Sequence, residues 1–354
     1  MQEQYTYSGN VIKQQPHVIH QVGGSKFSKV RDERIDAIKF WLITLVIAVH
    51  VLMRKEFAGS MACAVLWNWI CIFAMPLFIF ISGYFSRKKK WEDFLPSIWK
   101  LLEPLIIFQI IALLFYVDTL SFRTILTPWF MLWYLLSLIY WRIMLQLIPD
   151  KILRHKKIIL FSTFCISILA GFLPFDRFLS AQRALSLMPF FFLGYYMKGK
   201  SLYLPDKYRP LCVVFLSGIL AVIFFYPHRI GYLTYATPYS NIYGVMIRML
   251  AFILAVPMSI AFLNVCSHTP WIARQGRKTL QYYIYHGLII PPNSALIIPP
   301  FILVACKLNI PMTILTAIII AMAIVIGLSF ILKVSYVKML TNPSLLFVKK
   351  KIEQ

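Results

Sequence analysis

The sequence predicts an all-α, polytopic integral membrane protein with about ten transmembrane helices and with both termini in the cytoplasm. Of its 354 residues, 60% are hydrophobic and only 14% are charged, and the mean hydropathy is +0.72. Soluble domains are about 45–50% apolar and about 25% charged, so this composition excludes an ordinary soluble protein. It also excludes a disordered chain, and six cysteines in this length exclude a disulfide-dense secreted scaffold.

Ten apolar runs follow a polar N-terminal segment. Residues 1–30 lack an apolar core, so we expect a flexible cytoplasmic tail rather than a signal peptide, and the first apolar run then acts as an uncleaved anchor. Runs of about 17 to 25 apolar residues suffice to cross a bilayer. The sixth run is short and prolines interrupt the ninth. The runs are residues 37–53, 62–85, 101–117, 129–148, 158–175, 184–197, 211–227, 245–265, 280–305 and 311–332.

The positions of the basic residues test this number of spans. Cytoplasmic loops are enriched in Lys and Arg, and with the N-terminus inside, each inner loop is richer in them than either outer neighbour. The net charge of +23 is thereby explained as an orientation signal, and no nucleic-acid partner is needed. The sequence has no internal repeat and no long linker, so we expect one membrane domain at residues 31–340 and a basic cytoplasmic tail at residues 341–354.

The first apolar run carries three ionisable residues on one helical face. Lys39 and His50 are eleven positions apart, which is about three turns and about 16 Å along a helix, and Asp36 precedes Lys39 by three. Charged groups inside a membrane are functional candidates by default. A histidine can remove or return a proton near neutral pH, and a lysine at the inner face can hold a phosphate-bearing ligand. Alternatively, Lys39 extends its amine to the membrane surface and His50 bonds a neighbouring helix.

Those residues stand in RIDAIKFWLITLVIAVH, which resembles the first helix of the acyltransferase-3 superfamily of membrane O-acyltransferases. In that superfamily a basic residue, ten intervening positions and a histidine form the hallmark. Four later segments look like motifs of its fucose 4-O-acetylase and related sugar acetyltransferase branch, in the expected order. They are MPLFIFISGYFSRK (75–88), WFMLWYLLSLIYWR (129–142), LMPFFFLGYYMKGK (187–200) and GRKTLQYYIYHGLII (276–290).

The resemblance implies a cytoplasmic acetyl-CoA donor, a glycan hydroxyl as acceptor, and His50 as an essential catalytic group. We expect His50 to act as general base on the sugar hydroxyl or as relay for the acyl group, with Lys39 anchoring CoA and Asp36 orienting Lys39. Two features depart from the family. Lys39 stands where arginine is commoner, which keeps the charge but loses the two-pronged geometry that suits phosphate. The segment WFMLWYL lacks a glutamate that other branches have after the tryptophan, so their acceptors are not carried over.

The remaining candidates divide between donor and acceptor. Lys39, Lys88, Lys89, Lys100 and Arg142 are expected to hold the CoA phosphates, although an orientation signal or extension to the membrane surface explains them as well. Ser82 and Gly83 either line a pocket or allow close helix packing. For the acceptor the candidates are Trp129, Trp133, Tyr134, Arg248 and His286. Alternatively, the three aromatic residues form a girdle at the membrane interface, Arg248 extends to the membrane surface, and His286 is an interfacial histidine.

No metal site is expected, because the cysteines lack metal-type spacing and serve as small apolar packing residues. Nucleotide-binding, zinc-protease and serine-hydrolase motifs are absent from the sequence. The predicted function is O-acetylation of a sugar of a cell-surface or exported glycan by a multi-pass cell membrane protein, and the family resemblance implies the bacterial cytoplasmic membrane. The alternatives are a transporter of a lipid-linked or acylated glycan, with discontinuous helices at Pro76 and in the ninth run, and a non-catalytic subunit of a polysaccharide assembly complex.

Overall fold

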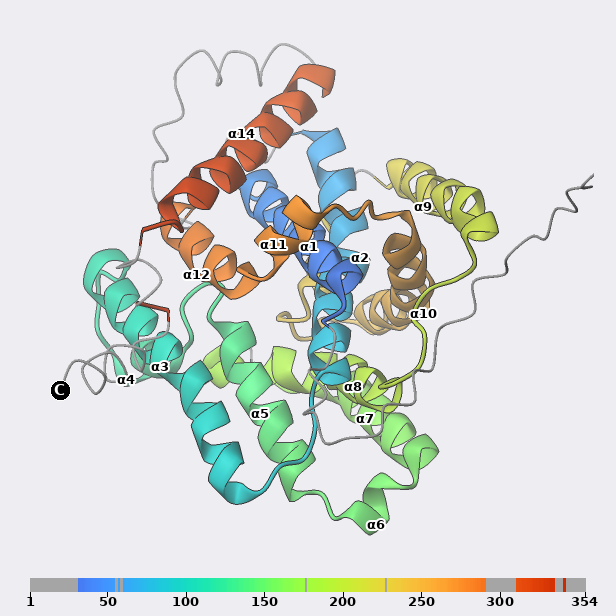
Figure 1. The fold of residues 1–354 in the computed structure, drawn as a ribbon. Coiled ribbons are helices and arrows are strands. Elements are labelled where there is room, and N and C mark those ends of the chain that lie inside the picture. The colour runs from blue at the N-terminus through green and yellow to red at the C-terminus, as the bar shows by residue number, and fades with distance from the viewer. Residues whose placement is uncertain are drawn as a thin grey trace, which may run out of the picture. The chain divides into compact units, whose positions relative to one another are not determined.

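Every regular element in the described part of the chain is a helix (Figure 1). The computed structural model describes residues 31–54, 57, 60–175, 177–226, 228–290, 310–334 and 340–341. The helices all belong to the unit of residues 33–354, which is separate from residues 1–32. Their bounds are α1 Glu33–Leu52, α2 Met61–Tyr84, α3 Trp91–Tyr116, α4 Phe122–Leu126, α5 Trp133–Leu147, α6 Asp150–Leu153, α7 Lys156–Ala170, η2 Phe178–Ser180, α8 Ala181–Tyr196, η3 Asp206–Tyr208, α9 Arg209–Phe224, η4 Gly231–Thr234, α10 Ile242–Val265, α11 Pro270–Gly276, α12 Thr279–Ile289 and α14 Ile310–Ile331.

Six helical segments within the described residues are long and apolar enough to cross a membrane. They are α1, α2, α3, the continuous segment Asp206–Phe224, α10 and Ile314–Ile331 of α14. Helices α5, α7, α8 and α12 coincide with the other four predicted runs but are 11 to 16 residues long. The all-helical prediction is therefore confirmed and a multi-pass membrane protein is supported, whereas the number of ten spans stays a prediction.

Three sequence predictions fall outside the described residues. They are the N-terminal tail of residues 1–30, the proline-rich part of the ninth run after residue 290, and the C-terminal tail except for Thr341. The other proline of the transporter alternative can be checked. Helix α2 continues without a break through Pro76, so the discontinuous helix that this alternative places in α2 is not there.

Helices α1 and α2 form the centre of the fold. In each of them 72% of the most apolar stretch is buried by the protein itself, against 22% for α3 and 11% for the segment containing α9. Figure 1 shows α1 and α2 side by side, with α9 and α10 on one side and α3, α12 and α14 on the other. Residues on these two helices are therefore surrounded by protein, and polar groups on them need protein partners.

Close packing of α2 on α8 depends on two glycines. A Cβ at Gly83 would overlap the carbonyl of Phe191, and a Cβ at Gly194 would overlap the carbonyl of Phe80. The two backbones therefore touch at reciprocal positions, which is the usual role of small residues between membrane helices. Gly83 thus packs helices, as one of the two sequence interpretations proposed.

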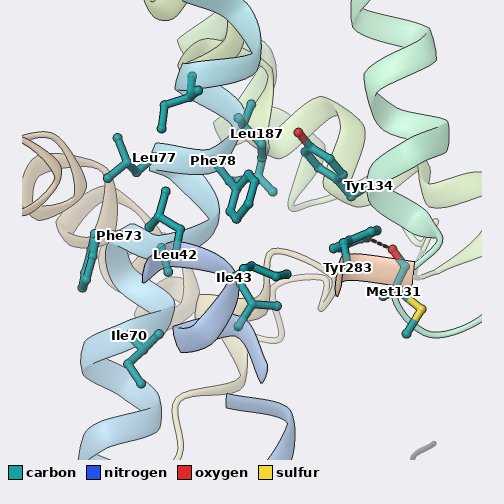
Figure 2. Packing of buried hydrophobic residues seen from close by; sticks show 14 of the residues in the cluster. Leu42, Ile43, Ile70, Phe73, Leu77, Phe78, Met131, Tyr134, Leu187 and Tyr283 are labelled. Carbon is teal, nitrogen blue, oxygen red and sulfur yellow. Dashed lines mark hydrogen bonds between the residues drawn. The ribbon is translucent and has the colours of Figure 1, made fainter. Parts of the chain in front are cut away.

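Two tyrosines, Tyr134 and Tyr283, lie in the core, and their hydroxyl groups form hydrogen bonds with neighbouring segments. Figure 2 shows apolar side chains of α1 and α2, such as Ile43 and Phe78, facing Tyr134 of α5 and Tyr283 of α12. The Tyr283 hydroxyl donates to the carbonyl of Met131, and the Tyr134 hydroxyl is hydrogen-bonded to Ser82 at 2.5 Å. These bonds satisfy the buried hydroxyls and fix both rings in the core.

Candidate functional site

Two histidines from distant parts of the sequence meet inside the helical unit. His50 stands in the last turn of α1 and His286 in the last turn of α12, and Nδ1 of His50 lies 2.9 Å from Nε2 of His286. The other nitrogen of His286, Nδ1, lies 2.9 Å from the carbonyl oxygen of Tyr282. His286 is fully buried and His50 is partly buried, so of the two side chains only His50 is accessible for a reaction.

A short loop before α5 covers this pair. The ring of Phe130 lies 4.5 Å from the ring of His50, and the backbone of Phe130 has a left-handed φ of 43°. This conformation is costly for a bulky residue, so the surroundings must enforce it. One restraint is Gln109 of α3, whose amide donates to the Thr127 carbonyl while its oxygen accepts from the Trp129 amide. Neither Phe130 nor Gln109 carried a signal in the sequence, because their roles depend on which helices are neighbours.

Asp36 and Lys39 form an ion pair at the start of α1. Lys39 Nζ lies 2.6 Å from Oδ1 of Asp36, whose side chain is only 3% exposed. Arg277, which precedes α12, reaches Asp36 Oδ2 at 3.7 Å and Glu33 at 2.9 Å. Gly276 makes this approach possible, because a Cβ there would overlap the Asp36 carbonyl. The sequence analysis paired Asp36 with Lys39 but did not single out Arg277, which lies more than two hundred residues away.

A central cavity of about 290 Å³ extends from Lys39 into the core. Lys39 and Arg142 are its basic lining residues, and its wall also includes Ser82, Tyr134 and Tyr283. The ring of Tyr283 is 5.9 Å from that of His286, so the cavity ends within one side chain of the histidine pair. Ser82 therefore lines a pocket, as the second sequence interpretation proposed. The other lining residues are Met75, Phe78, Ile81, Phe85, Leu101, Leu135, Leu138, Thr279 and Leu280.

A basic recess of about 520 Å³ lies between the α2–α3 loop and the start of α3. It is lined by Arg87, Lys88, Lys89, Asp93, Pro96, Ser97 and Lys100. Burial lowers the pKa of Lys89, and the charges of Arg142 and Arg87 lower it further. Arg142 thus interacts electrostatically with the recess and also lines the central cavity. Lys88 is already engaged, with the Ile148 carbonyl at 2.5 Å and with Asp150 at 2.9 Å.

The predicted acceptor residues separate into two groups. Tyr134 lines the central cavity and His286 joins His50, while Trp133 packs against Tyr134 and lies under the guanidinium of Arg183 at 4.7 Å. Arg183 is also close enough to His50 for an electrostatic interaction, and the sequence analysis did not single it out.

Trp129 and Arg248 contact other partners. The indole of Trp129 stacks on Tyr116 at 4.9 Å. Arg248 is fully buried, bonds Ser186 and the Thr237 carbonyl, and lies 4.5 Å from the Tyr239 ring. The interpretation that Arg248 extends to the membrane surface is therefore wrong, because α8 and the loop after η4 provide it with polar and aromatic partners inside the protein.

No cluster of metal-ligating side chains occurs in the described part of the chain, and five cysteines there are free.

Comparison with known proteins agrees with the site. No curated protein and no solved structure matches the chain significantly. The family model of the acyltransferase domain, Acyl_transf_3, matches residues 32–334 and therefore covers the histidine pair, the central cavity and the basic recess. The chain belongs to the acyltransferase-3 family and is a membrane acyltransferase.

Proposed function

We propose that this acyltransferase moves an acetyl group from acetyl-CoA to a sugar hydroxyl of a cell-surface or exported glycan, as its resemblance to the sugar acetyltransferase branch implies. The observation that supports it best is that a basic recess and an apolar cavity share the influence of Arg142, and that this cavity reaches a neighbour of the histidine pair. Arg142 lines the apolar cavity and acts electrostatically on Lys89 of the basic recess, and the wall of the cavity includes Tyr283, whose ring lies 5.9 Å from that of His286. A donor with phosphates at one end and a reactive thioester at the other matches this order of features.

The donor would lie with its phosphates at the basic recess and its thioester arm in the central cavity. Lys89 and Lys100 supply positive charge in the recess, and Arg142 and Lys39 supply it in the cavity. Asp36 holds Lys39 in place through the 2.6 Å ion pair. Lys88 contributes less, because Asp150 already neutralises it. The apolar lining beyond Lys39 suits the uncharged arm and excludes water from the reacting thioester.

His50 would act as the general base. It takes the proton of the sugar hydroxyl, whose oxygen forms a bond to the acetyl carbonyl carbon. The carbon–sulfur bond then breaks, and His50 returns the proton to the thiolate of CoA. Trp133 and Tyr134 lie next to the cavity, where aromatic faces suit a sugar ring. The partners of Arg248 described above do not include His50, and we assign Arg248 no part in this step.

For the membrane arrangement we propose ten spans with both termini in the cytoplasm, in a bacterial cytoplasmic membrane. The bilayer, acetyl-CoA and a glycan or lipid-linked sugar are then the partners of the protein. The basic recess faces the cytoplasm in this arrangement, which is the compartment that contains acetyl-CoA.

A deletion strain tests the function. We expect surface glycan from this strain to lose acetyl groups, the intact gene to restore them, and a His50→Ala gene that gives equal protein in the membrane not to restore them. The purified protein should bind acetyl-CoA saturably in detergent. Glycan that keeps its acetyl groups but stays inside the cell would instead support a transporter, and normal acetylation by His50→Ala protein would show that His50 is not the base.

A further inference from the structure

We propose that His286 is a positioning residue that fixes the tautomer of His50, so that the free lone pair of His50 is on Nε2. The inference rests on the proposed function only in taking His50 as the base. It explains why a second histidine, fully buried, is placed against the first. The sequence analysis left His286 between an active-site group and an interfacial histidine, and gave no role to its contact with His50.

The tautomer of His286 follows from its carbonyl partner. A carbonyl oxygen can only accept a hydrogen bond, and that of Tyr282 lies 2.9 Å from Nδ1 of His286. Nδ1 must therefore carry a proton, because two lone pairs at this distance would repel each other. A second proton on Nε2 would leave a cation in a fully buried position, which is costly. His286 is thus neutral, with an unprotonated Nε2.

The tautomer of His50 follows in turn. Nε2 of His286 can only accept, so Nδ1 of His50 donates across the 2.9 Å that separates them. The two ring planes are nearly parallel, with an angle of 15° between them. The 2.9 Å between the two nitrogens is shorter than the separation of rings stacked face to face, so the rings lie edge to edge and the hydrogen bond lies nearly in both ring planes. In a neutral His50 the lone pair then belongs to Nε2, which points away from His286.

This arrangement prepares His50 for its proposed step. A histidine in solution exchanges between two tautomers, and only the one with a free Nε2 could accept a proton here. When Nε2 takes the proton, the imidazolium keeps its Nδ1 bond to His286, which stabilises the charge. A further proton, on His286, would place two imidazolium cations with nitrogens 2.9 Å apart, so the neutral pair takes up only one added proton at a time.

The surroundings hold His286 in place. Gly287 follows it, and a Cβ there would overlap the side chain of Met131. The neighbouring Tyr283 hydroxyl donates to the Met131 carbonyl, a bond drawn in Figure 2. Helix α12 is thus tied to the loop that places Phe130 against His50. Among the described residues, Arg183 of α8 also acts electrostatically on His50, and the ionisable Tyr283 lies against the ring of His286.

Kinetics of three variants test the positioning role. Membranes containing each protein are given radiolabelled acetyl-CoA, and transfer to endogenous glycan is followed against acetyl-CoA concentration. For His286→Phe, which keeps a ring but has no acceptor, we expect the maximal rate to fall about 100-fold with an unchanged KM for acetyl-CoA. His286→Gln should recover part of the rate, because its amide oxygen can accept from His50. The exposed His155→Gln is the matched control and should behave as wild type.

Nitrogen NMR of histidine-labelled protein in detergent provides a readout that needs no activity. In the wild type we expect the proton on Nδ1 of both His50 and His286, with resonances assigned through the single variants. In His286→Phe the His50 signal should change to the Nε2-protonated form or to a mixture.

A wild-type His50 protonated on Nε2, or a His286→Phe protein with the normal maximal rate, would overturn the proposal. If the wild type transfers no acetyl group, the proposed function fails, while the tautomers measured by NMR still decide the inference.

Discussion

At the scale of single residues, the neighbours of each charged side chain in the site determine whether it can contact a ligand. Asp36 is nearly inaccessible and is shared by Lys39 and Arg277, so it acts on ligands only through them. Arg142 is different, because it lines the central cavity and also influences Lys89 in the basic recess. We therefore regard Arg142 as the cation that links the two proposed parts of the donor site.

Replacing Arg142 with glutamine should weaken donor binding selectively. We expect the KM for acetyl-CoA to rise about tenfold, because a charge-assisted bond to phosphate contributes about 1.5–3 kcal/mol, while the maximal rate changes little. Initial rates at varied acetyl-CoA concentrations measure both. Lys151→Gln, an exposed charge in α6, is the control and should leave KM unchanged. An unaltered KM in the Arg142 variant would remove this residue from the donor site.

Lys89 should make donor binding sensitive to alkaline pH. Its pKa is lowered from the usual 10.5 by burial, then by Arg142 and Arg87, so its charge is present below the lowered pKa and is lost as pH rises through it. Affinity for acetyl-CoA should therefore fall as the pH rises through a range below the ordinary lysine pKa of 10.5. Binding titrations at several pH values measure this. A Lys89→Arg protein stays charged and should keep its affinity over that range, and an identical decline in both proteins would contradict the assignment.

At the scale of helices, glycine contacts determine which backbones can approach. Gly83 and Gly194 bring α2 and α8 together, and Gly276 brings the end of α11 to α1. Their neighbours are carbonyl groups of the backbone, which cannot move aside as a flexible side chain could. Two other glycines, Gly218 in α9 and Gly327 in α14, have no atom within 4 Å of an added Cβ. Comparing alanine substitutions in the two sets separates the effect of helix–helix packing on stability from the effect of glycine on helix propensity.

Gly194→Ala should therefore destabilise the protein, whereas Gly218→Ala should not. Forcing α2 and α8 apart is an overpacking change with a cost of about 1–3 kcal/mol. At Gly218 alanine finds open space and favours the helix by about 0.5–1 kcal/mol. Thermal unfolding of the two variants in detergent, beside wild type, should give a lower midpoint for the first and an equal or higher midpoint for the second. Equal midpoints would mean that the α2–α8 contact has room to relax.

At the scale of the whole molecule, the segments predicted to share a membrane side contact one another. On the predicted inner side, Lys88 pairs with Asp150, Lys198 donates to the Ser86 carbonyl, and Arg209 to that of Val265. On the predicted outer side, Arg229 donates to the Leu52 carbonyl, and Tyr239 to that of Gly171. The pattern of basic residues and the tertiary contacts therefore group the same loops, although contacts alone do not say which group is cytoplasmic.

Thiol labelling of whole cells decides the orientation. In a protein without its six native cysteines, we expect Thr119→Cys, exposed in the α3–α4 loop, to react with a membrane-impermeant maleimide in intact cells. Lys207→Cys, exposed in η3, should react only after the membrane is permeabilised. The positive-inside distribution of charge is the reason for this expectation. The opposite labelling pattern would place the basic recess outside and would contradict cytoplasmic acetyl-CoA as the donor.

The sequence by itself predicted the helical membrane class, the Asp36–Lys39 pair and, by the resemblance of its motifs, the family and a catalytic role for His50, because composition, spacing and motifs along one helix are local properties. It also indicated the positions of all ten apolar runs. The ends of the helices differ from those of the runs: α5 begins four residues after its run, α7 ends five residues before its run does, and α8 begins three residues before its run.

Only the tertiary structure decided which distant residues meet. The bonds from His50 to His286, from Asp36 to Arg277 and from Met131 to Tyr283 join segments more than 150 residues apart. It also enclosed Arg248 and brought Arg183 near His50. Such pairs leave no periodic signal in a single sequence, because each depends on the crossing of separate helices, and the tautomer of a histidine depends on the partner that this crossing supplies.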